Sequence, residues 1–134
     1  MLSDLKRAHE TLLACLDELE KLAEANVPDP AKLASVRWKL SRASGERRKL
    51  VEAACDLLLN SANAIDRNRA AALRGESAEL IAASSRHVGR WTMDEVLADL
   101  VGYREASAAM RKSMRARIAQ EQRALYPLLE RAAA

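Results

Sequence analysis

The chain has 134 residues, of which 49% are hydrophobic, but it has no Phe and only 3% aromatic residues. Alanine and leucine supply most of the apolar content, which favours long helices over a sheet rich in β-branched and aromatic residues. The formal net charge of +3 is too near neutral to indicate a nucleic-acid or membrane partner by itself. We therefore expect one all-α domain over residues 1–134 and a cytoplasmic protein.

The first helix is predicted over residues 2–25. Its inward seam repeats every seven residues and contains a histidine: Leu5, His9, Leu12, Leu16 and Leu19. The helix should stop at Asn26, and Asp29 should cap the next helix with Pro30 at its first position.

The second helix is predicted over residues 30–60 and carries a stripe of apolar residues. The stripe consists of Leu33, Val36, Leu40, Ala43, Leu50, Ala54 and Leu57. Arg47 falls where this stripe expects an apolar residue. Residues 60–63, rich in Asn and Ser, should form the exit loop.

The third helix is predicted over residues 67–91. Its inward row is Leu73, Ser77, Leu80, Ser84, His87 and Trp91. Gly75 weakens the helix by about 1 kcal/mol relative to Ala, so the helix could instead begin after it.

The fourth helix is predicted over residues 93–131, because Thr92 and Glu95 form a capping-box pattern. We expect a bend or break near Gly102. The inward row is Ser107, Met110, Met114, Arg117, Glu121, Leu125 and Leu128. Short loops between four amphipathic helices predict an antiparallel up-and-down four-helix bundle.

Four polar residues interrupt these inward rows, namely His9, His87, Arg117 and Glu121. A single inward histidine is usually a hydrogen-bonded structural residue, but the two could also converge on a site inside the bundle, where such folds build metal centres. A buried carboxylate at position 121 needs a cation, a metal or several donors. Arg117 lies four residues earlier, where it could pair with Glu121 inside the bundle or only at its rim.

The segment 117–130, RIAQEQRALYPLLE, resembles the last-helix signature of the hemerythrin-like (HHE cation-binding) family, which is in outline H-I-x-x-E-E-x-x-L-Y-P-L-L-E. The first helix is similar to the H-x-x-L-x-x-x-L-x-x-L opening of that family, beginning at His9. The resemblance spans nearly the whole chain and implies a bacterial origin, although only the last motif is fairly specific.

The ligand pattern of that family is two rounds of a lone His followed by H-x-x-x-E on the next helix. By this resemblance His9 and His87 would be the lone ligands. In the second helix the best remnant is Arg48 with Glu52, and in the fourth helix Glu121 remains. Arg117 replaces the His that would precede it. At most two His and two Glu therefore survive from the diiron ligand set.

Arginine stays protonated and cannot ligate a metal, but it can neutralise a carboxylate that a metal once held. Our hypothesis is that Arg117, and in the second helix Arg48, replace the cations in ion pairs with Glu121 and Glu52. This predicts no cofactor. The alternative is residual binding of iron or zinc, or an oxygen response, through His9, Glu52, His87 and Glu121.

The sequence favours a regulatory or structural interaction protein over an enzyme, because it has no phosphate loop, no Ser/His/Asp arrangement and no paired catalytic carboxylates. The partner would be another protein or a second copy, contacted through exposed Trp38, Leu58 or Ala-rich faces. A third alternative is a nucleic-acid or acidic-ligand binder that uses a basic stretch of the fourth helix. That stretch contains Arg104, Arg111, Lys112, Arg115, Arg117 and Arg123. Without a recognition fold or aromatic platform we do not expect nucleic acid to be the partner.

Overall fold

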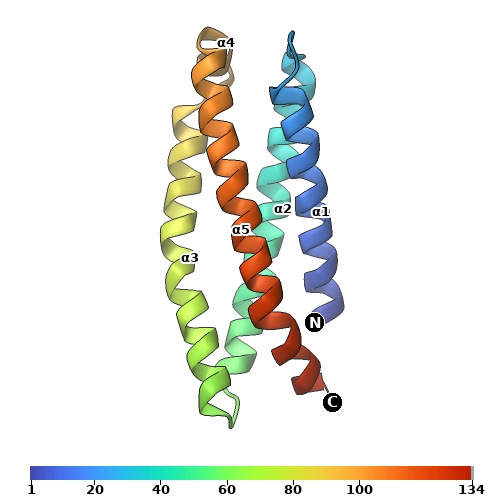
Figure 1. Ribbon diagram of the computed structural model, residues 1–134, viewed down its shortest axis with the longest axis vertical. Helices are drawn as coiled ribbons and strands as arrows, with labels where there is room; N and C mark the ends of the chain where they lie inside the picture. The colour runs from blue at the N-terminus through green and yellow to red at the C-terminus, as the bar shows by residue number, and fades with distance from the viewer. Residues whose placement is uncertain (134) are drawn as a thin grey trace.

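The structure is a computed structural model that describes residues 1–133, and of residues 76 and 77 it describes only the backbone. The side chain of Ser77, which belongs to the predicted third row, therefore lies outside the described part. The described residues form five helices and no strand: α1 (Leu2–Ala23), α2 (Pro30–Leu59), α3 (Ala64–Arg90), α4 (Met93–Ala98) and α5 (Leu100–Ala133). The four long helices lie side by side along the longest axis, and α4 is a short turn at one end (Figure 1).

The connections follow the caps that the side chains provide. Asp29 accepts hydrogen bonds from the backbone N–H groups of Ala31 and Lys32, each at 3.1 Å, so α2 begins at Pro30 as predicted. The predicted start of the third helix at residue 67 is wrong by one turn. Asn63 caps α3 by accepting from the N–H groups of the second and third residues that follow it, which lets the helix begin at residue 64.

The predicted interruption of the fourth helix occurs at Asp99, three residues before Gly102. The backbone of Asp99 leaves the helical region, at φ −140° and ψ 73°, and separates α4 from α5. The carboxylate of Asp99 then accepts the N–H of Gly102 at 3.0 Å and caps the start of α5. A Cβ at position 102 would collide with this carboxylate, so the glycine provides the space for the cap.

The core consists of two apolar clusters at the two ends of the molecule. The first cluster contains Leu12, Leu16, Leu19, Leu33, Val36, Leu40, Trp91, Val96, Tyr103 and Ile118, together with smaller residues. The second contains Leu5, Val51, Ala54, Leu58, Ala70, Leu73, Leu125, Leu128 and Leu129. The two cysteines are free thiols, with Cys15 in the first cluster and Cys55 in the second, and burial raises the pKa of each thiol.

The inward stripe of α2 moves by one position at Arg47. Beyond this residue Val51 and Leu58 are buried, whereas the predicted stripe residues Leu50 and Leu57 are half-buried and exposed. Leu58 is only 2% exposed, so its prediction as a dimer contact is wrong. Trp38 is 61% exposed, as expected, and the guanidinium of Arg42 lies over its ring.

The second half of α3 packs less tightly than the first. Ala70 and Leu73 are buried, whereas none of the described side chains between residues 74 and 90 is buried. Leu80, Ser84 and His87 face the bundle and are half-buried. Within the described residues, no helix combines the length and apolar character that crossing a membrane requires.

A buried ionic layer between two apolar clusters

A layer of polar side chains separates the two clusters. In α1, His9 lies between Leu5 of the second cluster and Leu12 of the first. Arg47 in α2 and Glu121 in α5 also lie between the clusters. Each has first-cluster residues before it in its helix and second-cluster residues after it. Arg117, one turn before Glu121, completes the set. We call His9, Arg47, Arg117 and Glu121 the ionic layer.

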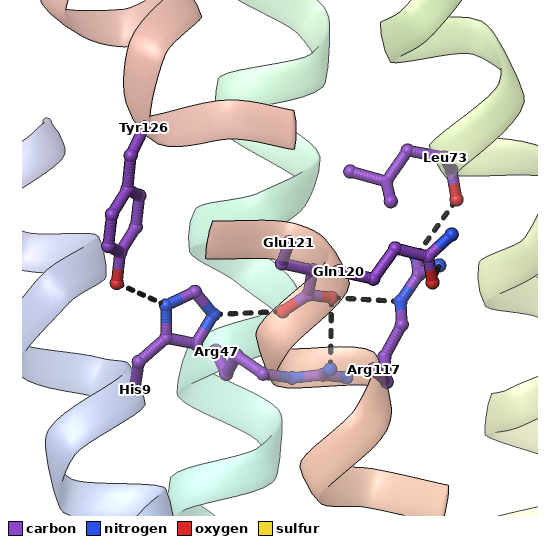
Figure 2. A network of polar contacts seen from close by, with 7 residues as sticks. All are labelled: His9, Arg47, Leu73, Arg117, Gln120, Glu121 and Tyr126. Carbon is purple, nitrogen blue, oxygen red and sulfur yellow. Dashed lines mark hydrogen bonds and ion pairs between the residues drawn. The ribbon is translucent and has the colours of Figure 1, made fainter. Parts of the chain in front are cut away.

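Glu121 is the centre of the layer and is only 1% exposed. Its Oε1 accepts a hydrogen bond from His9 Nε2 at 2.9 Å. Its Oε2 accepts from both Arg47 Nη1 and Arg117 Nε, each at 3.0 Å (Figure 2). The pairing predicted for Arg117 and Glu121 is therefore present, and it lies inside the molecule. Donors from α1, α2 and α5 thus share one carboxylate.

His9 links this carboxylate to Tyr126 near the end of α5. An ionised carboxylate only accepts hydrogen bonds, so the Nε2 of His9 carries the proton that it donates to Glu121. With the imidazole proton placed on Nε2, Nδ1 is the acceptor for the hydroxyl of Tyr126, which lies 2.6 Å away. Burial raises the pKa of Tyr126, which keeps this hydroxyl protonated. The chain of hydrogen bonds fixes the orientation of the imidazole.

Arg117 connects the layer to α3. Its Nη2 donates to the carbonyl oxygen of Leu73 at 2.9 Å, and its Nη1 donates to Gln120 Oε1 at 3.2 Å. Arg47 is less completely paired, because its buried Nε–H has no hydrogen-bond partner among the described residues. Burial lowers the pKa of Arg47, the neighbouring Glu121 opposes this shift, and the guanidinium groups of Arg117 and Arg48 reinforce it. Two guanidinium groups against one carboxylate leave an excess of one positive charge in the layer.

Arg48 and Glu52, the predicted second-helix pair, do not belong to this layer. Both side chains are exposed, and Arg47 occupies the inward position instead. The reason is the shift of the α2 stripe, which turns Arg47 and Val51 toward the core and the residues that follow them toward solvent. The sequence places Arg47 on the apolar stripe but does not identify it as a site residue; the spacing Ala43, Arg47, Val51, with one helical turn per step, is the signal that could have done so.

His87, the other predicted ligand, is not brought together with His9. It lies near the C-terminal end of α3, where its ring centroid is 6.3 Å from that of Tyr103. Burial and the positive charge of Arg37 lower the pKa of His87, so its imidazole is neutral at pH 7. In the described part of the chain, no third His, Cys, Asp or Glu joins His9 and Glu121 in a group that could hold a metal ion.

The basic stretch of α5 is distributed around the helix and much of it is paired. Arg104 donates to the carbonyl oxygens of Ala23 and Ala25 at the end of α1. Arg111 is buried and donates to Ser107, and it also forms an ion pair with Glu24 at 3.3 Å. Other basic side chains of the stretch reach acidic residues of α1 and the ionic layer, so the six do not form one free basic face.

Tyr126 is a hydrogen-bond partner of the ionic layer that the residue patterns alone did not identify. It lies within the segment that carries the family resemblance, but its contact with His9 becomes visible only when α1 and α5 are packed together.

No family model, curated protein or solved structure matches the chain. The function is therefore inferred from the geometry of the ionic layer and its surroundings.

Proposed function

We propose that this protein is a non-catalytic interaction module whose core holds an ion-pair network in place of a metal centre. The observation that carries the proposal is the occupation of both oxygens of Glu121 by donors from three helices. A metal ion at this carboxylate would have to displace at least one of these donors, the imidazole from Oε1 or a guanidinium from Oε2. It would also approach two fixed positive charges that lie 3.0 Å from the same oxygen.

In this proposal the chain is an antiparallel up-and-down bundle of the hemerythrin-like kind. Support comes from the alternation of the connections, since α1 and α2 are joined at one end of the molecule and α2 and α3 at the other (Figure 1). The placement of Glu121 and Arg117 on the inner face of α5 agrees with the ligand positions that the segment 117–130 suggests. Arg47 and Arg117 then supply positive charge in place of the two metal cations.

The role of such a module would be regulatory or structural, with a protein or a second copy as the partner. The functional side chains of the layer are engaged with one another, and Glu121 is too deeply buried to meet a substrate. The residual metal-binding alternative needs His9, Glu52, His87 and Glu121 to approach one ion, whereas Glu52 is exposed on α2 and His87 lies beside Tyr103.

Metal analysis tests the proposal directly. The protein would be expressed with added iron and zinc, purified without chelator, and measured for metal content and thermal unfolding. We expect a substoichiometric metal content and a Tm that neither EDTA nor added metal changes. One equivalent of tightly held iron or zinc, lost together with stability on chelation, would contradict the proposal.

A matched variant tests whether Arg47 and Arg117 exclude the metal ion. The double substitution Arg47→His and Arg117→His adds two imidazoles around Glu121 and removes both fixed charges. We expect this variant to bind added Co²⁺ with visible d–d absorption, while the wild type remains colourless. A wild type that binds Co²⁺ equally well would show that the guanidinium groups do not replace a metal.

A further inference from the structure

A cavity of about 550 Å³ opens between α2, α3 and α5, directly beside the ionic layer. It lies next to the loosely packed second half of α3. Its size falls in the range of about 300–1,000 Å³ that is typical of sites for small organic ligands. Between residues 74 and 90 of α3, none of the described side chains is buried, so the cavity results from how the three helices pack.

One end of the cavity is strongly cationic. Arg47, Arg48 and Arg117 line it, and among the described residues its lining contains no Asp or Glu. Among the described residues, the carboxylate that pairs with Arg47 and Arg117 is that of Glu121, so one negative charge faces three guanidinium groups there. Serine hydroxyls from all three helices, including Ser44, add further hydrogen-bond donors. This end is therefore suited to a negatively charged oxygen group.

The other end is mainly apolar. A second cavity, of about 240 Å³, continues from the first and shares lining residues with it, among them His87, Met110 and Met114. It extends toward Leu40, Met93 and Tyr103. Arg37 also lines this end, but its guanidinium donates to the carbonyl oxygen of Trp91 and to the sulfur of Met93. We call the two cavities together the groove.

Two buried polar groups of the groove lining have no hydrogen-bond partner among the described residues. One is the Nε–H of Arg47 at the cationic end, and the other is the hydroxyl of Tyr103 at the apolar end. Arg47 is 9% exposed and Tyr103 is 0% exposed. An unpaired buried polar group costs about 1–3 kcal/mol, so two along one groove are consistent with a site shaped for a ligand.

We propose that the groove binds the anion of a single-chain carboxylic acid, with its head group among Arg47, Arg48 and Arg117 and its hydrocarbon chain toward Met110 and Tyr103. A guanidinium matches a carboxylate in shape and charge, and the flexible Met side chains adapt to an aliphatic chain. A divalent cation is excluded by the charge of the cationic end, and a compact inorganic anion would leave the apolar end empty.

The carboxylic acid anion would be the ligand of the proposed interaction module. Its binding rests on the proposed function in one respect, namely that no metal ion takes the place of Arg47 and Arg117 beside Glu121. Binding of such an anion would draw α3 toward α2 and α5, because its head group meets residues of α2 and α5 while its chain contacts Val88 and His87 of α3. The ligand would thus change the packing of α3, whose described side chains between residues 74 and 90 are half-buried or exposed.

Titration with dodecanoate, below its micelle concentration, tests the inference. Binding can be followed by calorimetry and by tryptophan fluorescence, which comes from Trp38 at the second cavity and from the buried Trp91. We expect saturation at one dodecanoate per chain, about tenfold tighter than dodecanol, because the alcohol lacks the charge that the arginines recognise. Acetate, which has the head group without the chain, and dodecyltrimethylammonium, which has the opposite charge, should not saturate. Equal binding of the acid and the alcohol, or no binding of the acid, would overturn the inference.

Arg48→Gln is the variant that reports on the head group, since this side chain is exposed and lies outside the contacts of Glu121. We expect it to weaken dodecanoate binding about tenfold without changing dodecanol binding. Arg69→Gln is the matched control, because Arg69 is an exposed arginine that does not line the groove. Equal effects of the two substitutions would contradict the assigned head-group site.

Ser84→Trp fills the groove from α3 and should abolish binding while thermal unfolding stays cooperative. If the groove is instead covered by a second copy, the wild type will be a dimer by analytical ultracentrifugation, this variant will be a monomer, and dodecanoate will not bind. That outcome would overturn the inference. Metal analysis decides the proposed function and dodecanoate titration decides the ligand, so either can fail without the other.

Discussion

Glu121 is the residue on which the interior charge balance depends. Its carboxylate neutralises one of the two guanidinium groups of the ionic layer and accepts a hydrogen bond from His9. Burying charges is costly, and the attraction among them repays that cost only while every partner is present. Removal of one member should therefore be far more damaging than replacement of the whole set.

The first prediction concerns the removal of this charge. Glu121→Gln should destabilise the protein by about 3–5 kcal/mol, because Arg47 and Arg117 would remain buried without a counter-charge. The triple variant with Arg47→Met and Arg117→Met added should recover most of this loss, since the introduced amide oxygen can still accept from His9. Denaturant unfolding of both variants measures the difference. As a control, Glu105→Gln on the exposed face of α5 should change stability by less than about 0.5 kcal/mol. A triple variant no more stable than the single one would show that the charges are not coupled.

The two tyrosines provide a second prediction. The hydroxyl of Tyr126 donates a hydrogen bond to His9, whereas the buried hydroxyl of Tyr103 has no hydrogen-bond partner among the described residues. Tyr126→Phe should cost about 1 kcal/mol, because the Nδ1 of His9 is left without a donor. Tyr103→Phe should be neutral or stabilising. The free energy of unfolding of the two variants, measured in the same denaturant, compares them directly, and the reverse order would contradict the hydrogen-bond assignment.

At the level of the elements, the junction between α4 and α5 depends on one side chain and one missing side chain. Asp99 caps α5 through the N–H of Gly102, and a Cβ at position 102 would collide with the capping carboxylate. Glycine inside a helix normally costs about 1 kcal/mol relative to alanine. Here that cost is linked to the cap, which is worth about 1 kcal/mol.

A double-mutant cycle tests this link and gives the third prediction. In the wild-type background Gly102→Ala should bring little or no gain, because the better helix former displaces the cap. In the Asp99→Ala background the same substitution should stabilise the protein by about 1 kcal/mol. Thermal or denaturant unfolding of the four proteins measures the coupling. Equal effects of Gly102→Ala in both backgrounds would mean that the carboxylate and the glycine act independently.

The helices could be predicted from the sequence because their stripes and caps are local features. Asp29 and Thr92 mark the starts of α2 and α4, and the apolar rows place His9, Arg117 and Glu121 on inner faces. The predicted start of α3 is wrong because the sequence assigns Asn63 to the loop, as a residue type common in loops, whereas in the fold its side chain caps the helix.

The composition of the ionic layer could be predicted only in part, because it joins residues distant in the sequence. The pair Arg117 and Glu121 lies on one helix and follows from spacing, whereas the choice between Arg47 and Arg48 depends on the rotation of α2. That rotation changes where the stripe steps from Ala43 to Arg47 to Val51, and a long helix tolerates either choice until its neighbours are placed. Tyr126 likewise acquires its partner only through packing.

At the scale of the whole molecule, stability should respond to pH through His87. Burial and the charge of Arg37 lower its pKa in the folded state, whereas the unfolded chain takes up the proton near the ordinary value of about 6.5. The unfolded state therefore binds more protons as the pH falls below this value, and stability decreases.

The fourth prediction is that His87→Gln reduces this loss. The wild type should lose stability between about pH 7.5 and about pH 5.5 more steeply than the variant, with the two curves converging above about pH 7.5. Denaturant unfolding at a series of pH values gives both slopes, and His9 remains in both proteins, so its contribution cancels. A variant with the same slope as the wild type would show that His87 does not titrate differently in the two states.

The division of the core by the ionic layer also restricts how the helices can slide along one another. Two apolar seams of Leu and Ala could match equally well after a shift of one or two turns, because each leucine would find another leucine. The layer opposes such a shift, since His9 and Arg47 both donate to Glu121 at the observed alignment, and sliding one helix by a turn would separate these partners inside the core. A single polar layer in an apolar interface is known to select one alignment in this way. Burying these charges would thus lower the stability of the fold but select a single register of the helices.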